Sequence, residues 1–154
     1  MNANAGVIEH FYEAFARRDH AVMAACYTPS ARFADPVFPS LVGAEIGTMW
    51  QMLCERAKDL RIEHGPVHAE GDRARVHWEA WYTYSATGRR VHNRIAAAFV
   101  FDRGRISRHD DVFDLYAWAR QALGLKGALL GWAPPGQRAI RAQAARSLER
   151  FAHR

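Results

Sequence analysis

The sequence predicts an α+β fold in which helices precede an antiparallel sheet, and two observations predict it. Residues 7–57 carry apolar side chains mostly at helical spacing, with one short extended segment among them. From Leu60 onward, apolar and polar residues alternate in runs that glycine-containing turns separate. Short turns join antiparallel neighbours, so these runs predict a four-stranded meander. Helices grouped before a meander are typical of a layered α+β fold.

Length and composition indicate one folded domain spanning residues 1–154. The chain is long enough for a sizeable core, and its apolar content of 49% argues against disorder. No apolar run approaches the roughly 18 residues of a membrane span, and the amino terminus does not resemble a signal peptide. Cys26 and Cys54 lack a CxxC spacing and are expected to be buried thiols. We therefore expect a cytoplasmic protein with no membrane partner.

The net charge of +5 is concentrated near the C-terminus. From Lys126 to Arg154 there are six basic residues and one acidic residue, so this segment alone carries +5 and the preceding 125 residues are neutral. No recognised basic and aromatic binding motif accompanies the charge, and no nucleic-acid partner is predicted.

The first part of the chain is expected to contain three helices and one strand. Asp19 can cap the second helix, which Pro29 is expected to end, and Pro36 ends the strand. In order, we expect a helix over 7–16, a short helix that includes 22–27, a strand over 31–35, a loop over 37–42 and a helix over 44–57.

The second part is expected to contain the meander and a helical C-terminal extension. Asp114 is expected to cap the helix that follows the meander, and Gly124 to end it. The expected strands cover 60–69, 73–85, 89–101 and 105–113, and the extension over 115–154 consists of a helix over 115–123, an apolar connection over 126–132 and a last helix opened by Pro134 and Pro135.

The alternation along 105–113 places the ionisable side chains of His109 and Asp111 on one face of the last expected strand. Side chains point to opposite faces with period two, so Ser107, His109, Asp111 and Phe113 should share a face. The more aromatic faces of the neighbouring strands are assigned to the inside, beneath the helices. The residues assigned inside are Trp78, Ala80, Tyr82, Tyr84, Asn93, Ile95, Ala97, Phe99 and Phe101.

The opposite, outer face of the sheet is unusually apolar for a solvated surface. It is expected to carry Trp81, Val100 and Val112. Such a face predicts a homodimer formed through the outer sheet.

Three short motifs between Val7 and Trp118 together carry a family resemblance. They are Phe11-Tyr12-Glu13-Ala14-Phe15 with Arg18-Asp19, Phe33-Ala34-Asp35-Pro36-Val37, and Gly104-Arg105-Ile106 leading to His109-x-Asp111-x-Phe113-Asp114. The chain resembles the nuclear transport factor 2-like superfamily, in particular its SnoaL-like polyketide cyclase and ketosteroid isomerase-related branch. The resemblance implies a cone-like curved sheet around a pocket that the first and third helices close.

The resemblance also implies roles for particular residues. In ketosteroid isomerases a tyrosine and a protonated aspartate hold the substrate oxyanion while a second aspartate moves the proton. The tyrosine matches Tyr12 and the base matches Asp35, but the oxyanion aspartate falls at Ala97, which argues against that mechanism. The SnoaL-like cyclases imply an acid/base aspartate on the last strand, for which Asp111 is the nearest match.

Limonene epoxide hydrolases use two aspartates and an arginine that positions a water. Asn93 and Arg94 are expected on opposite faces of their strand, so that triad is not evident here.

We therefore expect an enzyme that needs no cofactor and moves a proton next to the carbonyl group of a small apolar or aromatic compound. Asp35, His109 and Asp111 are the expected catalytic residues, and the choice of base between the two aspartates stays open. The expected ligand-binding residues are Tyr12, Trp50, Trp78, Tyr82, Asn93 and Phe113. No metal-ligand spacing is found.

Two alternatives remain. The same pocket could hold a small hydrophobic ligand without catalysis. The chain could instead be a dimeric interaction module that uses the basic tail or the apolar outer sheet.

Overall fold

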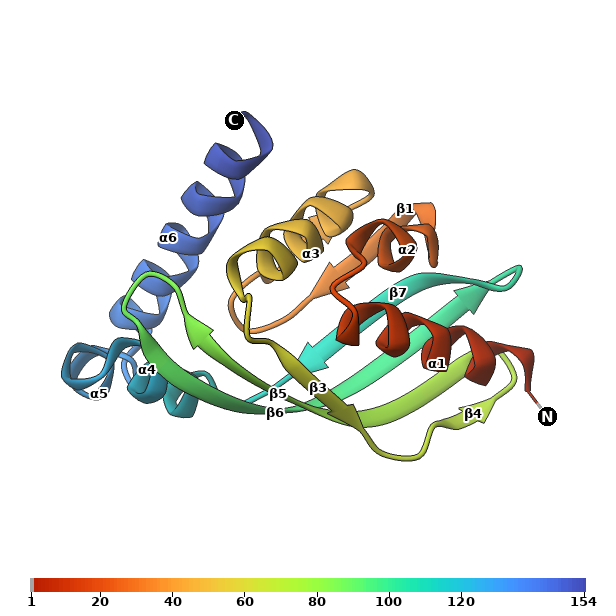
Figure 1. The fold of residues 1–154 in the computed structure, drawn as a ribbon, viewed down its shortest axis with the longest axis horizontal. Coiled ribbons are helices and arrows are strands. Elements are labelled where there is room, and N and C mark those ends of the chain that lie inside the picture. The colour runs from red at the N-terminus through yellow and green to blue at the C-terminus, as the bar shows by residue number, and fades with distance from the viewer. Residues whose placement is uncertain (1) are drawn as a thin grey trace.

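One curved, mixed sheet organises the computed structural model, which describes residues 2–154 (Figure 1). The strand order is β2-β1-β7-β6-β5-β3, and β4 also pairs with β5. In chain order the strands are β1 (Tyr27–Ala34), β2 (Leu41–Val42), β3 (Arg61–His64), β4 (His68–Glu70), β5 (Arg73–Tyr84), β6 (Arg89–Asp102) and β7 (Arg105–Val112). The α+β architecture is the predicted one.

The helices form two groups around the sheet. Figure 1 shows the first three along one face and the last three gathered at one end, where the last helix also contacts α3. In chain order the helices are α1 (Ala3–Ala16), α2 (His20–Ala25), α3 (Ala44–Arg56), α4 (Leu115–Leu123), α5 (Leu125–Leu130) and α6 (Pro134–Ala152). Within residues 2–154, no helix has both the length and the apolar content needed to cross a membrane.

Two predicted helix caps are present. The carboxylate of Asp19 accepts a hydrogen bond from the backbone N–H of Val22 at 3.2 Å. Asp114 accepts one from Ala117 at 3.0 Å at the start of α4. Each cap satisfies a backbone donor that the helix leaves unpaired, and such caps typically stabilise a protein by about 1 kcal/mol.

The segment around Pro29 was predicted wrongly. Tyr27 begins β1 and does not belong to α2, which ends at Ala25. Pro29, expected to end the helix, lies inside β1, where pairing with β7 is irregular between Tyr27 and Arg32. Proline has no N–H for a ladder hydrogen bond, and an irregular stretch tolerates it. Tyr27 consequently lies next to β7, where it pairs with Ile106.

Three further details of the sheet differ from the prediction. The sheet is not wholly antiparallel, because β1 pairs with β7 in parallel. The segment expected as one strand over 60–69 forms β3 and β4 on either side of Pro66, and the expected loop over 37–42 contains β2. In addition, α5 occupies most of the connection expected over 126–132.

A bulge in β7 corrects one face assignment. Val100 pairs with Arg108 and Phe101 with Ile106, so Ser107 is an extra residue in β7. Ile106 takes the buried position instead, and the Ser107 hydroxyl donates to the Val100 carbonyl at 3.1 Å. Beyond the bulge, His109 and Asp111 are buried on the inner face, as predicted.

An aromatic core joins the N-terminal helices to the inner face. Phe15 of α1 lies 5.0 Å from Trp50 of α3 and 5.4 Å from Trp78 of β5 between ring centroids. Phe11 lies 5.9 Å from the ring of His109. Aromatic pairs at these separations and steep angles add to the stabilisation from burial. The core thus surrounds His109 with apolar rings.

The outer face of the sheet carries exposed small and apolar side chains. Val112 is 64% exposed and pairs with Ala96, which is exposed as well. The homodimer predicted from this face remains a prediction, and the two residues mark where its centre should lie.

Val112→Glu is expected to convert the dimer to a monomer, because a carboxylate in an apolar sheet contact loses its hydration without gaining a partner. We expect at least about tenfold weaker association by sedimentation velocity. His10→Glu, on the exposed side of α1, serves as the control that leaves association unchanged. A monomeric parent protein, or a Val112→Glu variant that associates normally, would refute the predicted interface.

Candidate active site

A cavity of about 500 Å³ lies between α3, the inner face of β5–β7 and the C-terminal helices. Its volume is within the usual range for small-molecule sites. Buried lining side chains, each at most 6% exposed, form its floor, and they include Trp50, Trp78, Ala80 and Ile95. The floor is therefore largely aromatic and aliphatic.

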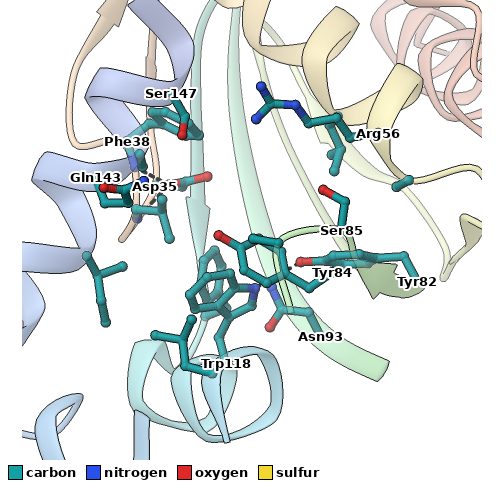
Figure 2. A pocket seen from close by; sticks show the side chains of 18 of the residues that line it. Asp35, Phe38, Arg56, Tyr82, Tyr84, Ser85, Asn93, Trp118, Gln143 and Ser147 are labelled. Carbon is teal, nitrogen blue, oxygen red and sulfur yellow. Dashed lines mark hydrogen bonds between the residues drawn. The ribbon is translucent and has the colours of Figure 1, made fainter. Parts of the chain in front are cut away.

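Asp35 follows β1 directly, and Figure 2 shows its carboxyl group pointing into the cavity. Oδ1 accepts the backbone N–H groups of Val37 at 2.7 Å and Phe38 at 2.6 Å. An aspartate before a proline commonly bonds the backbone ahead of it in this way. Both bonds use Oδ1, which leaves Oδ2 to the cavity.

The environment of Asp35 suits acid/base chemistry near neutral pH. Its pKa is raised to about 7, chiefly by desolvation on burial and also by the nearby charge of Asp111, while the two backbone bonds oppose the rise. Asp35 is half-buried, because its carboxyl group faces the cavity while protein packs around the rest of the residue. A carboxyl group with this pKa is populated in both protonation states at pH 7.

Asp111 also lines the cavity, and a buried hydrogen bond fixes it. Its Oδ1 lies 2.8 Å from Nε2 of His109 and accepts the indole N–H of Trp78 at 3.3 Å. His109 has no exposed surface and Asp111 is 4% exposed. A carboxylate held by two donors stays oriented in an apolar floor.

The chain of hydrogen bonds continues behind His109. Nδ1 of the imidazole lies 2.7 Å from the Tyr27 hydroxyl, and that hydroxyl accepts the indole N–H of Trp50 at 3.1 Å. Every bond is satisfied if Tyr27 donates to Nδ1 and Nε2 donates to Asp111, which assigns His109 as the neutral Nε2–H tautomer.

Parallel pairing brings the two carboxyl groups together. Phe33 pairs with His109 and Ala34 with Asp110. One further step in this register places Asp35 beside Asp111, and period two puts both on the inner face. Two carboxyl groups in unlike environments recur in sites that perform acid/base catalysis.

Most of the predicted ligand-binding residues line the cavity. These are Trp50, Trp78, Tyr82, Asn93 and Phe113. The Tyr82 hydroxyl accepts the Trp118 indole N–H at 2.9 Å, and burial raises its pKa to about 12. Figure 2 shows Tyr82 and Tyr84 pointing into the same space as Asp35. The Tyr82 proton can therefore be donated to a ligand oxygen.

Two predicted residues lie behind the cavity wall. Neither His109 nor Tyr12 is among the lining residues, and His109 bonds the lining residue Asp111 from behind. The Tyr12 hydroxyl is buried without a hydrogen-bond partner among residues 2–154, and burial raises its pKa well above the usual value. No three His, Cys, Asp or Glu side chains in that range are grouped as metal ligands.

The sequence reasoning missed Tyr27 and the contribution of the last helices. Tyr27 shares its period-two position with Ala31, Phe33 and Asp35, and this pattern could have extended the predicted strand. Residues of α4, α5 and α6 line one side of the cavity, and nothing in their own pattern indicates which pocket they close.

A comparison with protein families tests the resemblance stated above. Residues 8–109 match the model of the SnoaL-like domain. The chain belongs to this family. The match ends before α4, so it does not include the C-terminal helices.

Solved structures similar to this SnoaL-like chain share its fold. An NTF2-like protein of unknown function from Burkholderia pseudomallei matches with a TM-score of 0.70 and 22% identity, over 79% of this chain and 98% of its own. A candidate SnoaL-like polyketide cyclase from Jannaschia sp. CCS1 matches with a TM-score of 0.67 and 17% identity, over 77% of this chain and 90% of its own. An LEH-like epoxide hydrolase from M. tuberculosis matches with a TM-score of 0.63 and 19% identity, over 85% of this chain and 97% of its own. No curated protein matches significantly.

Tyr27→Phe is expected to destabilise the SnoaL-like fold by about 1–3 kcal/mol, because it leaves Trp50 Nε1 and His109 Nδ1 buried without partners. Tyr12→Phe is the matched control, since it removes a buried hydroxyl that has no partner, and it should be neutral or stabilising. Urea unfolding measures both. Equal effects of the two variants would contradict the hydrogen-bond chain.

The raised pKa of Asp35 predicts a pH-dependent stability. Its folded pKa of about 7 exceeds the ordinary value of 3.8, so the folded state binds the extra proton and loses stability as pH rises through 7. Between about pH 5 and about pH 8 the free energy of unfolding should fall by about 2–3 kcal/mol relative to Asp35→Asn, measured in urea. Parallel pH profiles for the two proteins would show that the carboxyl group titrates normally.

Proposed function

We propose that this protein is a cofactor-independent enzyme that moves a proton next to the carbonyl group of a small apolar or aromatic compound, with Asp35 as the acid/base group. The observation that carries the proposal is a carboxyl group with a pKa of about 7 that points into a largely apolar cavity. Matching of the pKa to the operating pH is what general acid/base catalysis requires.

The proposed reaction starts with ionised Asp35. Its Oδ2 takes a proton from the carbon next to the carbonyl group. The C–H electron pair forms a carbon–carbon double bond, and the C=O π pair moves to the carbonyl oxygen, which gives an enolate. The Tyr82 hydroxyl, whose oxygen already accepts the Trp118 N–H, donates to that oxygen. Asp35 then returns the proton to a different carbon, which completes an isomerisation. In a cyclisation, the enolate carbon instead attacks a second carbonyl carbon of the same molecule, and Asp35 gives its proton to the oxygen of that carbonyl group.

Asp111 has a different role in this proposal. Its Oδ1 is occupied by His109 and Trp78, and its charge is one cause of the raised pKa of Asp35. We assign Asp111 as the group that tunes Asp35, and His109 and Tyr27 as residues that position Asp111. Of the two aspartates between which the sequence left the base open, we thus propose Asp35.

The similar structures support an enzyme in general terms. One is a candidate polyketide cyclase and another an epoxide hydrolase. The cyclase chemistry is the closer one, since Arg94 bonds Glu79 at 3.2 Å on the outer face and is not available to position a water in the cavity. The buried free thiols of Cys26 and Cys54 support the cytoplasmic location that we infer.

A second candidate function is non-catalytic binding of a small hydrophobic ligand. It is favoured by the apolar floor and by the C-terminal helices that cover one side of the cavity. Burial raises the pKa of Asp35 under either candidate, so turnover of a bound ketone discriminates between them.

The bicyclic aromatic ketone 2-tetralone tests the proposal, with NMR to follow exchange of its α-hydrogens into D2O. We expect the protein to accelerate exchange, with a rate that rises with pH and reaches half its maximum near pH 7, because ionised Asp35 is the base. Asp35→Asn should lower the rate at least about a hundredfold and leave ketone binding intact.

Asp111→Asn separates the roles of the two carboxyl groups. It should retain exchange and shift the midpoint to lower pH, because it removes a negative charge that raises the pKa of Asp35. Loss of exchange in this variant alone would make Asp111 the base. Binding of the ketone without any accelerated exchange would favour the non-catalytic binder.

A further inference from the structure

Three cationic side chains from three helices line the solvent-exposed part of the cavity, which we call its mouth. Arg56 ends α3, Lys126 lies in α5 and Arg146 in α6, and all three line the cavity while remaining exposed. Figure 2 shows Arg56 on the same side of the cavity as Ser85. Segments far apart in the sequence therefore place positive charge around one opening.

No carboxylate within residues 2–154 forms an ion pair with any of these three side chains. Arg146 donates only to the neutral side-chain amide of Gln143, at 2.9 Å. Other C-terminal arginines are bonded within the protein: Arg141 of α6 donates to the Pro36 carbonyl at 2.9 Å, and Arg154, beyond α6, lies 3.4 Å from Glu55. The charge at the mouth is thus unneutralised by the protein itself.

The acidic lining residues are less exposed to solvent than these cations. Asp35 and Asp111 belong to the inner face of the sheet, and Asp111 is 4% exposed. An anionic group beside them would lose its hydration and meet a like charge, which is costly in a low-dielectric floor. At the mouth, the same group would keep water on one side and meet only cations. The charges therefore favour an anionic ligand group at the mouth over one beside Asp35 and Asp111.

We propose that the natural ligand carries an anionic group, such as a carboxylate, at the end remote from its reacting carbonyl group, and that Arg56, Lys126 and Arg146 bind it. The inference rests on the proposed function, because it takes the carbonyl end to lie against Asp35. Arginine can hold a carboxylate with two parallel N–H bonds, and lysine adds a compact positive charge. The ligand is then an amphipathic aromatic or alicyclic keto acid.

A matched pair of probes tests this ligand class. One probe is 2-tetralone bearing a carboxylic acid on its aromatic ring at the 6-position, and the other is the primary amide of that acid, which has nearly the same shape and no charge. Quenching of the tryptophans that line the cavity reports binding of each. At about 0.02 M NaCl the acid should bind about tenfold more tightly than the amide, and at about 0.5 M the preference should shrink toward equality.

The triple variant Arg56→Gln, Lys126→Gln, Arg146→Gln should bind acid and amide equally. Its affinity for the amide should match that of the parent protein, which shows that the cavity is intact. Arg138→Gln is the matched control, because Arg138 is exposed on α6 and does not line the cavity. This control should keep the preference for the acid.

Equal affinities in the parent protein, or a preference that survives in the triple variant, would overturn the inference. Exchange of the amide probe's α-hydrogens reports the proposed function separately. Exchange without a preference for the acid would defeat only the ligand assignment. A preference for the acid without exchange would defeat only the proton-transfer proposal.

Discussion

The parallel contact between β1 and β7 determines where the ionisable groups of this protein lie. It pairs Phe33 with His109 and Ala34 with Asp110, and it thereby carries Asp35 to the side of Asp111. Both strands contain an irregularity, at Tyr27–Arg32 and at Ser107, that adjusts which residues meet. A slip of one residue in β7 would turn its histidine and aspartate to the outer face, since side chains alternate with period two. The irregularities are therefore part of the site as well as of the sheet.

The polar chain behind the cavity explains why two aspartates on one face differ in character. Buried polar networks are stable when each member has a partner, and the chain from Trp50 through Tyr27 and His109 to Asp111 meets this condition. Asp111 is consequently held from behind by side chains. Asp35 is held only at Oδ1, by backbone N–H groups of its own turn, and its second oxygen faces the cavity. The same burial that makes a charge on Asp35 costly raises its pKa into the range where it can exchange protons.

Local sequence patterns were sufficient for much of this arrangement. Alternation with period two correctly placed Trp78, Tyr82 and Asp111 on the inner face, and the helix caps at Asp19 and Asp114 follow from side-chain chemistry alone. Tyr27 was placed in a helix because the pattern before Pro29 contains no information about β7, which lies about eighty residues later in the chain. The raised pKa of Asp35 was equally out of reach, since it depends on burial by segments that are distant in sequence.

The C-terminal helices lie outside the region that matches the family, and they complete the cavity. The family match ends at residue 109, and α4–α6 supply one side of the cavity and two of the three cations at its mouth. The net charge of +5 near the C-terminus is thus distributed among internal bonds, as for Arg141, and the cavity rim, as for Lys126 and Arg146. A nucleic-acid surface would require these charges to form a stripe facing solvent. Lys126 and Arg146 instead line a largely apolar cavity, and the proposed small anionic ligand accounts for their position there.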